Sequence, residues 1–164
     1  MKEIILGAGC FWGTQAFFDK IKGVEKTDVG YANGLLDEVT YEEVCKGNTE
    51  FIEVCKITFD ENIISLEKIL EKFFKIIDPT LVNQQGNDFG TQYQSAIFFH
   101  QSDEQSFKNI INNFIEKMQI NYKNKIETKV DYLKNYISAE EYHQKYLEKN
   151  PYGYCHINLD LADD

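Results

Sequence analysis

Segments with the period of a β-strand alternate along this chain with segments that have the period of an α-helix. Residues 51–60 alternate strictly, so one side of a strand would carry Phe51, Glu53, Cys55, Ile57 and Phe59. Residues 65–77 have the pattern of an amphipathic helix, with an apolar stripe of Leu66, Ile69, Leu70, Phe73, Phe74 and Ile77. Both apolar surfaces must be buried, and packing helices on a sheet buries both.

The same patterns predict the other elements. Strands are expected over residues 2–8, 25–31, 93–100 and 126–132. Helices are expected from Phe11 to a stop at Gly23, over 41–45 behind a Thr40 cap, over 102–118 and over 142–147. Capping-box spacing occurs at 102–105 and at 138–141. We therefore predict an α+β fold: a two-layer α/β sandwich with a mixed sheet, a ferredoxin-like core and a long C-terminal coil over about 148–164.

Composition excludes several classes of protein. The 164 residues contain no linker or internal repeat, so one domain is expected over 1–164. The net charge of −10 would repel nucleic acid and anionic membranes, and no apolar run approaches the ~20 residues of a membrane-spanning helix. The four cysteines include no C-x-x-C pair, so no metal is expected. We expect a monomer with reduced thiols in the cytoplasm.

Cys10 lies between glycines where the predicted first strand gives way to a helix. A helix N-terminus carries partial positive charge and free N–H donors, and both favour a thiolate. The glycines of the Gly9–Gly13 segment would let a ligand approach the backbone closely. Cys10 is therefore a candidate nucleophile, although a cysteine packed in a tight turn would give the same pattern.

Glu53 is a carboxylate on the apolar side of the alternating strand. If that side is buried, loss of hydration raises the pKa of Glu53 and keeps it neutral at pH 7. A neutral carboxylic acid can donate a proton or a hydrogen bond. The alternative is an edge strand on which Glu53 is exposed to solvent.

Four further residues are weaker candidates from the pattern alone. Cys155 lies on a loop rich in Pro, Gly and Tyr, where a thiol could reach a distant one or simply remain free. Tyr41 and Tyr93 begin elements beside polar loops and could offer hydroxyl groups, or could be core or surface residues. Asp88 has the surroundings of a turn residue. The spacing of the three histidines does not indicate a Cys–His hydrolase.

Four ordered blocks of the chain resemble the peptide methionine sulfoxide reductases of the A type. The blocks are GCFWG at 9–13, TYEEVCKG at 40–47 with 49–54, GNDFGTQYQS at 86–95, and YHQKYL at 142–147 with KNPYGYC at 149–155. They span nearly the whole chain, and their combination is far more specific than any one block. The resemblance likewise implies a two-layer α+β sandwich with a long coil.

The resemblance also implies a redox mechanism. Glu53 would be the acid that activates the sulfoxide oxygen, and Cys10 the nucleophile that attacks the sulfur of the S epimer, leaving methionine and a sulfenic acid. Cys155 would condense with the sulfenic acid to form a disulfide. An external dithiol, either thioredoxin or dithiothreitol, would then reduce that disulfide. No bound cofactor is implied, and the expected partners are thioredoxin and the proteins and peptides that contain methionine sulfoxide.

Five more residues take roles in substrate binding from the same resemblance. Tyr41, Asp88 and Tyr93 would assist in binding the sulfoxide oxygen. Phe11 and Trp12 would line the pocket for the methyl group. Cys45 and Cys55 are expected to be structural.

The chain departs from the family pattern in two places. Glu50-Phe51 stands where the family typically has Gly-His, and Gln94 where it has Arg. Both changes remove possible positive charge near the site. Because no further recycling cysteine follows, any disulfide relay should stop at Cys155.

The protonation state of Cys10 follows from the charges around it. A free thiol has a pKa of ~8.5, the chain contains no arginine, and no lysine lies close to Cys10 in sequence. We therefore expect resting Cys10 to be mostly thiol, with the proton passing toward the sulfoxide through Glu53. Two alternatives remain. One is a thiol peroxidase, which would lack an arginine to hold peroxide; the other is a non-catalytic, redox-responsive methionine-binding protein.

Overall fold

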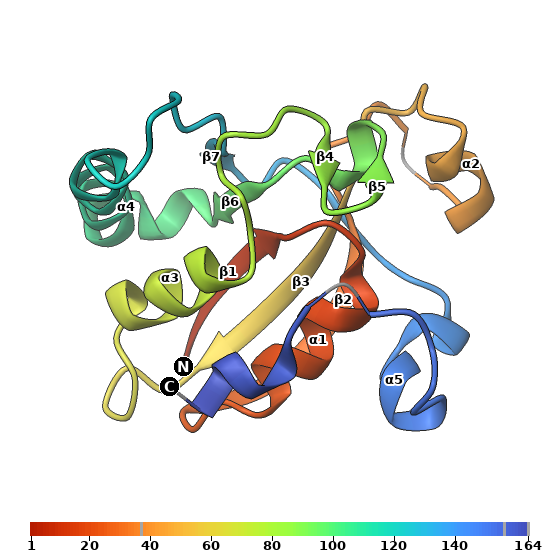
Figure 1. The fold of residues 1–164 in the computed structure, drawn as a ribbon, viewed down its shortest axis with the longest axis horizontal. Helices are drawn as coiled ribbons and strands as arrows, with labels where there is room; N and C mark the ends of the chain where they lie inside the picture. The colour runs from red at the N-terminus through yellow and green to blue at the C-terminus, as the bar shows by residue number, and fades with distance from the viewer. Residues whose placement is uncertain (37, 156, 164) are drawn as a thin grey trace.

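The computed structural model describes residues 1–36, 38–155 and 157–163, and in it six strands form one sheet (Figure 1). The strand order is β7-β6-β1-β3-β2-β8. The strands are β1 (Lys2–Gly7), β2 (Val24–Ala32), β3 (Ile52–Phe59), β6 (Ala96–Phe99), β7 (Lys129–Tyr132) and β8 (Tyr136–Ser138). β6 and β7 are parallel and the other neighbours are antiparallel. The prediction of an α+β fold with a mixed sheet is confirmed.

Of the three helix caps that the sequence predicts, the one at Thr40 is confirmed. The α-helices are α1 (Phe11–Asp19), α2 (Tyr41–Cys45), α3 (Leu66–Lys75), α4 (Glu104–Gln119) and α5 (Tyr146–Lys149). Thr40 and Glu43 form a capping box, and Ser65 Oγ accepts a hydrogen bond from the backbone of α3. The capping boxes predicted at 102–105 and 138–141 are wrong, because Asp103 and Glu140 take the cap positions without a side-chain bond.

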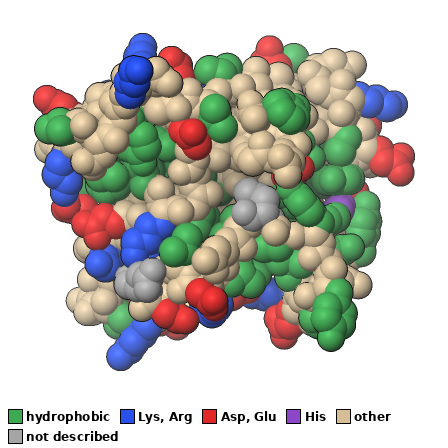
Figure 2. Space-filling model, in the orientation of Figure 1, with side chains coloured by type: hydrophobic (Ala, Val, Ile, Leu, Met, Phe, Trp, Pro, Cys, Tyr) green, Lys and Arg blue, Asp and Glu red, His purple; other side chains and the backbone are tan. Residues whose placement is uncertain are grey.

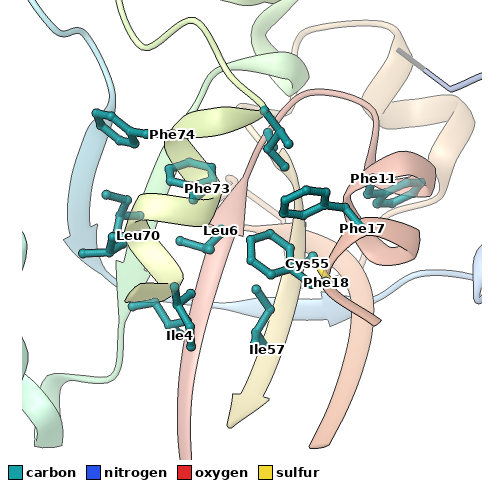
Figure 3. Packing of buried hydrophobic residues seen from close by; sticks show 14 of the residues in the cluster. Ile4, Leu6, Phe11, Phe17, Phe18, Cys55, Ile57, Leu70, Phe73 and Phe74 are labelled. Carbon is teal, nitrogen blue, oxygen red and sulfur yellow. The ribbon is translucent and has the colours of Figure 1, made fainter. Parts of the chain in front are cut away.

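The sheet buries different clusters on its two faces. Cys55, Ile57 and Phe59 of β3 join the large cluster beneath the helices (Figure 3). Ile52 and Val54 belong to a smaller cluster on the other face, against which Leu133 and Tyr136 pack. The alternation predicted over residues 51–60 is therefore confirmed, and Glu53 lies on the helix-covered side.

The loop predicted before the fourth strand contains extra structure. β4 (Gln84–Gln85) and β5 (Asp88–Phe89) form a short hairpin, and a 3-10 turn, η1 (Thr91–Tyr93), follows it. β6 consequently begins at Ala96 rather than near residue 93. Long-range hydrogen bonds hold this region, and a local hydrophobic period does not report them.

The helix predicted over 142–147 is split into a 3-10 turn, η3 (Glu141–His143), and α5. The amide of Gln144 explains the split. Its Nε2 donates to the carbonyl oxygen of Val29 at 2.8 Å, and its Oε1 accepts from the Val29 N–H at 3.1 Å. Gln144 thereby pairs with the backbone of β2, and Lys145 takes a left-handed φ of 55°.

The C-terminal segment is anchored on the helical layer. After α5 the chain passes the start of α1, and a last 3-10 turn, η4 (Leu159–Asp163), lies against α1 and α3 (Figure 1). Lys20 Nζ donates to Leu159 O at 3.2 Å, and the buried Lys72 Nζ donates to Ala162 O at 2.9 Å. These contacts hold the stretch that carries Cys155. Within the described ranges, none of the helices combines the length and apolar character needed to cross a bilayer.

Gln94 ties the β4–β5 hairpin to the sheet. Its buried side chain accepts a hydrogen bond from Asn83 N at 2.7 Å and donates to Ser95 O at 3.2 Å and Glu127 O at 3.0 Å. Gln94→Ala removes all three bonds and leaves backbone groups without these partners. We expect the free energy of unfolding in urea to fall by about 1–3 kcal/mol, whereas the exposed Gln101→Ala should leave it unchanged. An unchanged urea midpoint in Gln94→Ala would contradict this role.

Candidate active site

Cys10 occupies the turn between β1 and α1. Gly9 makes that turn with φ +84°, a conformation that side chains rarely adopt. Cys10 follows as the N-cap residue of α1, and its thiol makes no capping bond. The residue is only 6% exposed. The thiol therefore lies at the positive end of α1 but is largely removed from water.

Glu53 reaches the same point from the centre of the sheet. It is 1% exposed, so the alternative of an edge strand with an exposed carboxylate is wrong. Its Oε1 accepts a hydrogen bond from the first N–H of α1, at Phe11, over 3.3 Å. Among the described residues, Oε2 has no partner although it is buried.

Burial raises the pKa of Glu53 to about 8, and the negative charge of Asp88 adds to this shift. The Phe11 N–H acts in the opposite direction but does not offset the burial. Glu53 is therefore a neutral acid at pH 7. Because Oε1 accepts from Phe11, the acidic hydrogen belongs on Oε2, where a donor is available for a ligand.

Burial also raises the pKa of the Cys10 thiol far above its ordinary value, and Glu53 raises it further when ionised. The Trp12 N–H lowers the pKa of Cys10, but only partly compensates. This direction agrees with the expectation that resting Cys10 is a thiol. The N-terminus of α1 does not by itself outweigh the loss of hydration.

Tyr41 of α2 and Tyr93 at the end of η1 bring two hydroxyl groups toward Glu53. Burial raises the pKa of both, and the charge of Glu53 raises each further. Both side chains are half-buried. At neutral pH they are protonated and able to donate hydrogen bonds.

Asp88 is held beside the site by the C-terminal segment. Its Oδ2 accepts a hydrogen bond from Tyr154 Oη at 3.1 Å. Its charge raises the pKa of Cys10 and of Glu53. The β4–β5 hairpin and the segment before Cys155 therefore meet at the site.

Cys155 lies against the first turn of α1 because Gly13 has no side chain. A Cβ at Gly13 would stand 2.9 Å from Cys155 Sγ and 3.3 Å from Ile157 Cδ1. Cys155 Sγ donates to Ile157 O at 3.3 Å. A negative charge on Cys155 would raise the pKa of Cys10, so the two sulfur atoms lie within electrostatic reach of each other. The two cysteines that lie 145 positions apart in sequence are thus brought to one end of α1.

Phe11 and Trp12 lie differently around the start of α1. Phe11 is buried, with ring centroids 5.7 Å from Tyr31 and 5.3 Å from His143. Trp12 is partly exposed and stacks on Tyr146 at 3.8 Å with an interplanar angle of 11°. Of the two, Trp12 is the one that offers a partly accessible face.

His143 was not identified from the sequence as a member of the site. Its Nδ1 accepts a hydrogen bond from Trp12 Nε1 at 2.9 Å, so the ring hydrogen belongs on Nε2. Nε2 is buried and has no partner in the part of the chain that the structure describes. Burial lowers the pKa of His143, which keeps the ring neutral. Its only signal in the sequence is its place in the block at 142–147.

The departures from the family pattern have structural explanations. Phe51 is buried in the large core cluster and packs on Gly34, while Glu50 is exposed. Gln94 is buried, and the hydrogen bonds described above use both its amide oxygen and its amide nitrogen.

Cys55 is a core residue, whereas Cys45 lies exposed on α2. Across the described ranges, no three His, Cys, Asp or Glu side chains are grouped to hold a metal ion.

Comparison with known proteins agrees with the resemblance inferred from the four blocks. Residues 2–164 match the family model described as peptide methionine sulfoxide reductase. Over 160 residues the chain is 54% identical to the peptide methionine sulfoxide reductase MsrA of Clostridium perfringens (strain 13 / Type A), covering 98% of this chain and 100% of that one.

Solved structures show the same fold. Mxr1 from Saccharomyces cerevisiae in its reduced form superposes with a TM-score of 0.86 at 41% identity, covering 94% of this chain and 88% of that one. Mxr1 in complex with Trx2 gives a TM-score of 0.58 at 30% identity, covering 88% and 84%. The chain therefore belongs to the peptide methionine sulfoxide reductase (MsrA) family.

Proposed function

We propose that this enzyme reduces the S epimer of methionine sulfoxide in polypeptides with Cys10 as nucleophile, Glu53 as acid and Cys155 as resolving thiol. The observation that carries the proposal is the buried Oε2 of Glu53, which has no hydrogen-bond partner among the described residues, on a side chain that the N–H next to Cys10 holds through Oε1. Because burial raises the pKa of Glu53 to about 8, this oxygen carries the proton at neutral pH. A sulfoxide reacts with a thiol only when its oxygen is protonated or strongly hydrogen-bonded. Glu53 supplies that activation next to the sulfur that attacks.

In the first step one oxygen atom is removed from the sulfoxide and Cys10 becomes oxidised. Glu53 donates its proton to the sulfoxide oxygen as the sulfur of Cys10 attacks the substrate sulfur, and the Cys10 thiol proton replaces the one that Glu53 gave up. An S–S bond forms between Cys10 and the substrate sulfur, which now carries a hydroxyl group. That hydroxyl group leaves as water with the proton of Glu53, which breaks the S–O bond. A water molecule then attacks the sulfur of Cys10 and breaks the S–S bond, and its proton returns to Glu53. Methionine leaves, and Cys10 remains as a sulfenic acid, oxidised by two electrons.

The neighbouring side chains position the substrate for this step. Tyr41 and Tyr93 donate hydrogen bonds to the sulfoxide oxygen, which their raised pKa values keep possible at neutral pH. Asp88 assists from the hairpin side of the site. Phe11 and Trp12 form the apolar surface that receives the methyl group.

In the second step Cys155 attacks the sulfenic sulfur of Cys10, water leaves and a disulfide forms. An external dithiol reduces this disulfide by exchange, which returns both thiols. The complex of the related Mxr1 with Trx2 supports a thioredoxin as that dithiol, and dithiothreitol should replace it in an assay. The proposal needs no bound cofactor or metal.

We also propose that the core of the fold is ferredoxin-like. The order β6-β1-β3-β2 is antiparallel throughout, and the elements β1-α1-β2-β3-α3-β6 follow one another in sequence, apart from α2 and the β4–β5 hairpin. The segment over about 148–164 then acts as the coil that delivers Cys155 to this core. A single catalytic domain over 1–164, a monomer and a cytoplasmic location remain predictions from the sequence.

The direct test follows methionine and cysteine oxidation together. With dithiothreitol and a peptide containing methionine S-sulfoxide, we expect Cys10→Ser to form none of the reduced, methionine-containing peptide. Without any reductant, Cys155→Ser should release one methionine per enzyme and form no disulfide, as mass mapping would show. Turnover of hydrogen peroxide alone would indicate a thiol peroxidase, and binding without turnover a methionine-binding protein.

The acid role of Glu53 predicts a pH dependence. Below its pKa of about 8 Glu53 is neutral and can donate, so the single-turnover rate of methionine release should fall as the pH rises past that value. Glu53→Gln keeps the shape but has no acidic proton, so we expect a loss of about 10²–10⁴-fold and no fall near pH 8. The exposed Glu61→Gln should behave as the unaltered protein. A wild-type rate that is flat or rising from pH 7 to 9 would refute the role.

The contact between Gly13 and Cys155 predicts a defect confined to the second step. In Gly13→Ala the added Cβ would collide with Cys155 Sγ. We expect methionine release from the first turnover to be unchanged, and disulfide formation to slow by about ten- to a hundredfold. Turnover with dithiothreitol, which reduces the sulfenic acid directly, should be preserved. Equal slowing of both steps would instead indicate a general distortion of α1.

A further inference from the structure

The most exposed aromatic side chains of the described residues are gathered around the active site. Phe89 is 70% exposed, Tyr142 57% and Tyr154 44%, and Tyr152 is fully exposed. Apart from Met1, the other exposed large apolar side chains among the described residues are aliphatic. We refer to Phe89, Tyr142, Tyr152 and Tyr154 together as the aromatic rim.

Three members of the aromatic rim neighbour a residue of the site in sequence or by contact. Phe89 follows Asp88 on β5, and Tyr154 donates its hydroxyl hydrogen to Asp88. The ring of Tyr142 lies 4.0 Å from that of His143, between centroids. Tyr152 lies on the same loop as Tyr154. Figure 2 shows hydrophobic side chains reaching the surface at the α2 and α5 end of this face, as well as at the α3 and α4 end.

Large exposed aromatic groups beside a reactive centre are typical of a surface that binds a partner. Tyr and Phe offer wide apolar contact area and lose little conformational freedom when they bind, because they have few rotatable bonds. The aromatic rim adjoins a site that acts on only one side chain of its substrate, the methionine sulfoxide. The remainder of a polypeptide substrate must therefore lie across its surroundings.

Carboxylates stand beside the rim and give it a charge preference. Glu140 and the exposed Glu42 lie near Tyr142, and their charges raise the pKa of its hydroxyl after burial does. Asp88 precedes Phe89 on β5 and accepts the hydrogen bond from Tyr154. An acidic residue next to methionine sulfoxide would be repelled by these groups, as would the free carboxylate of the amino acid itself.

We propose that the aromatic rim binds the residues that flank methionine sulfoxide in a polypeptide, favouring apolar neighbours and disfavouring acidic ones. This inference rests on the proposed function and adds the class of segment that the site accepts. A second copy of this chain is a poorer occupant, because each copy carries a net charge of −10.

The test compares one small substrate with two peptides, using dithiothreitol as reductant. The small substrate is N-acetyl-methionine S-sulfoxide amide, which has neither flanking residues nor a free carboxylate. The peptides place Leu or Glu on both sides of the methionine S-sulfoxide. In the unaltered protein we expect kcat/KM to be highest for the Leu peptide and lowest for the Glu peptide.

Phe89→Ala isolates the rim, because Phe89 is exposed and lies outside the residues assigned to the reaction. We expect kcat/KM for the Leu peptide to fall by about fivefold while the value for the small substrate stays the same. Ile120→Ala is the matched control: Ile120 is 86% exposed and follows α4, which lies across the molecule from α2 and α5 in Figure 1. It should change neither value.

Three results would overturn the inference: an unchanged Leu peptide in Phe89→Ala, an equal loss on the peptide and the small substrate, or a loss seen only when thioredoxin replaces dithiothreitol. The last result would assign the rim to the reductant. Failure of the proposed function is distinguishable, because the unaltered protein would then reduce none of the three sulfoxides, and the inference would fall with it.

Discussion

The hydrogen bond from the Phe11 N–H to Glu53 is the contact on which the site depends. It joins the first turn of α1 to the centre of the sheet, where β3 lies between β1 and β2. Because Cys10 immediately precedes that turn, one bond sets the position of the proposed nucleophile relative to the proposed acid. The same bond occupies Oε1 and leaves Oε2 to carry the proton. A site built this way requires the correct register between β1 and β3, in which Leu6 lies opposite Cys55.

Burying this acid costs stability, and the sign of the cost can be worked out. Folding raises the pKa of Glu53 from 4.5 to about 8, so the folded chain holds a proton that the unfolded chain releases. The stability tied to this proton is complete below pH 4.5 and is lost as the pH rises through 8. Relative to its value below pH 4.5, the free energy of unfolding at pH 7 is therefore lower by about 3 kcal/mol. The large core cluster of α1, α3, α4 and the sheet offsets it (Figure 3).

The sequence predicted those parts of the molecule that local periodicity encodes. The alternation over 51–60 placed Glu53 on the apolar side of a strand, and the glycines around Cys10 indicated a turn into a helix. Periodicity could not settle whether Glu53 is buried, because that depends on β1 and β2 lying on either side. The break at Gln144 was missed for the same reason: its amide pairs with Val29, 115 positions away, and a hydrophobic pattern carries no trace of such a bond. The roles of Tyr41, Tyr93 and Cys155 came from the resemblance, and only their burial and contacts come from the fold.

The absence of arginine suits the chemistry of this substrate. A sulfoxide is neutral but strongly polar, so neutral donors such as the acid form of Glu53 and the hydroxyl groups of Tyr41 and Tyr93 can stabilise its oxygen without an accompanying cation. In a buried site these donors are effective because water does not compete with them. An anionic ligand would meet Asp88 with no guanidinium group to offset it. The arrangement that we propose for activating a sulfoxide thus also rejects anions, and a cation placed near Glu53 would weaken the proposed chemistry by favouring the ionised carboxylate.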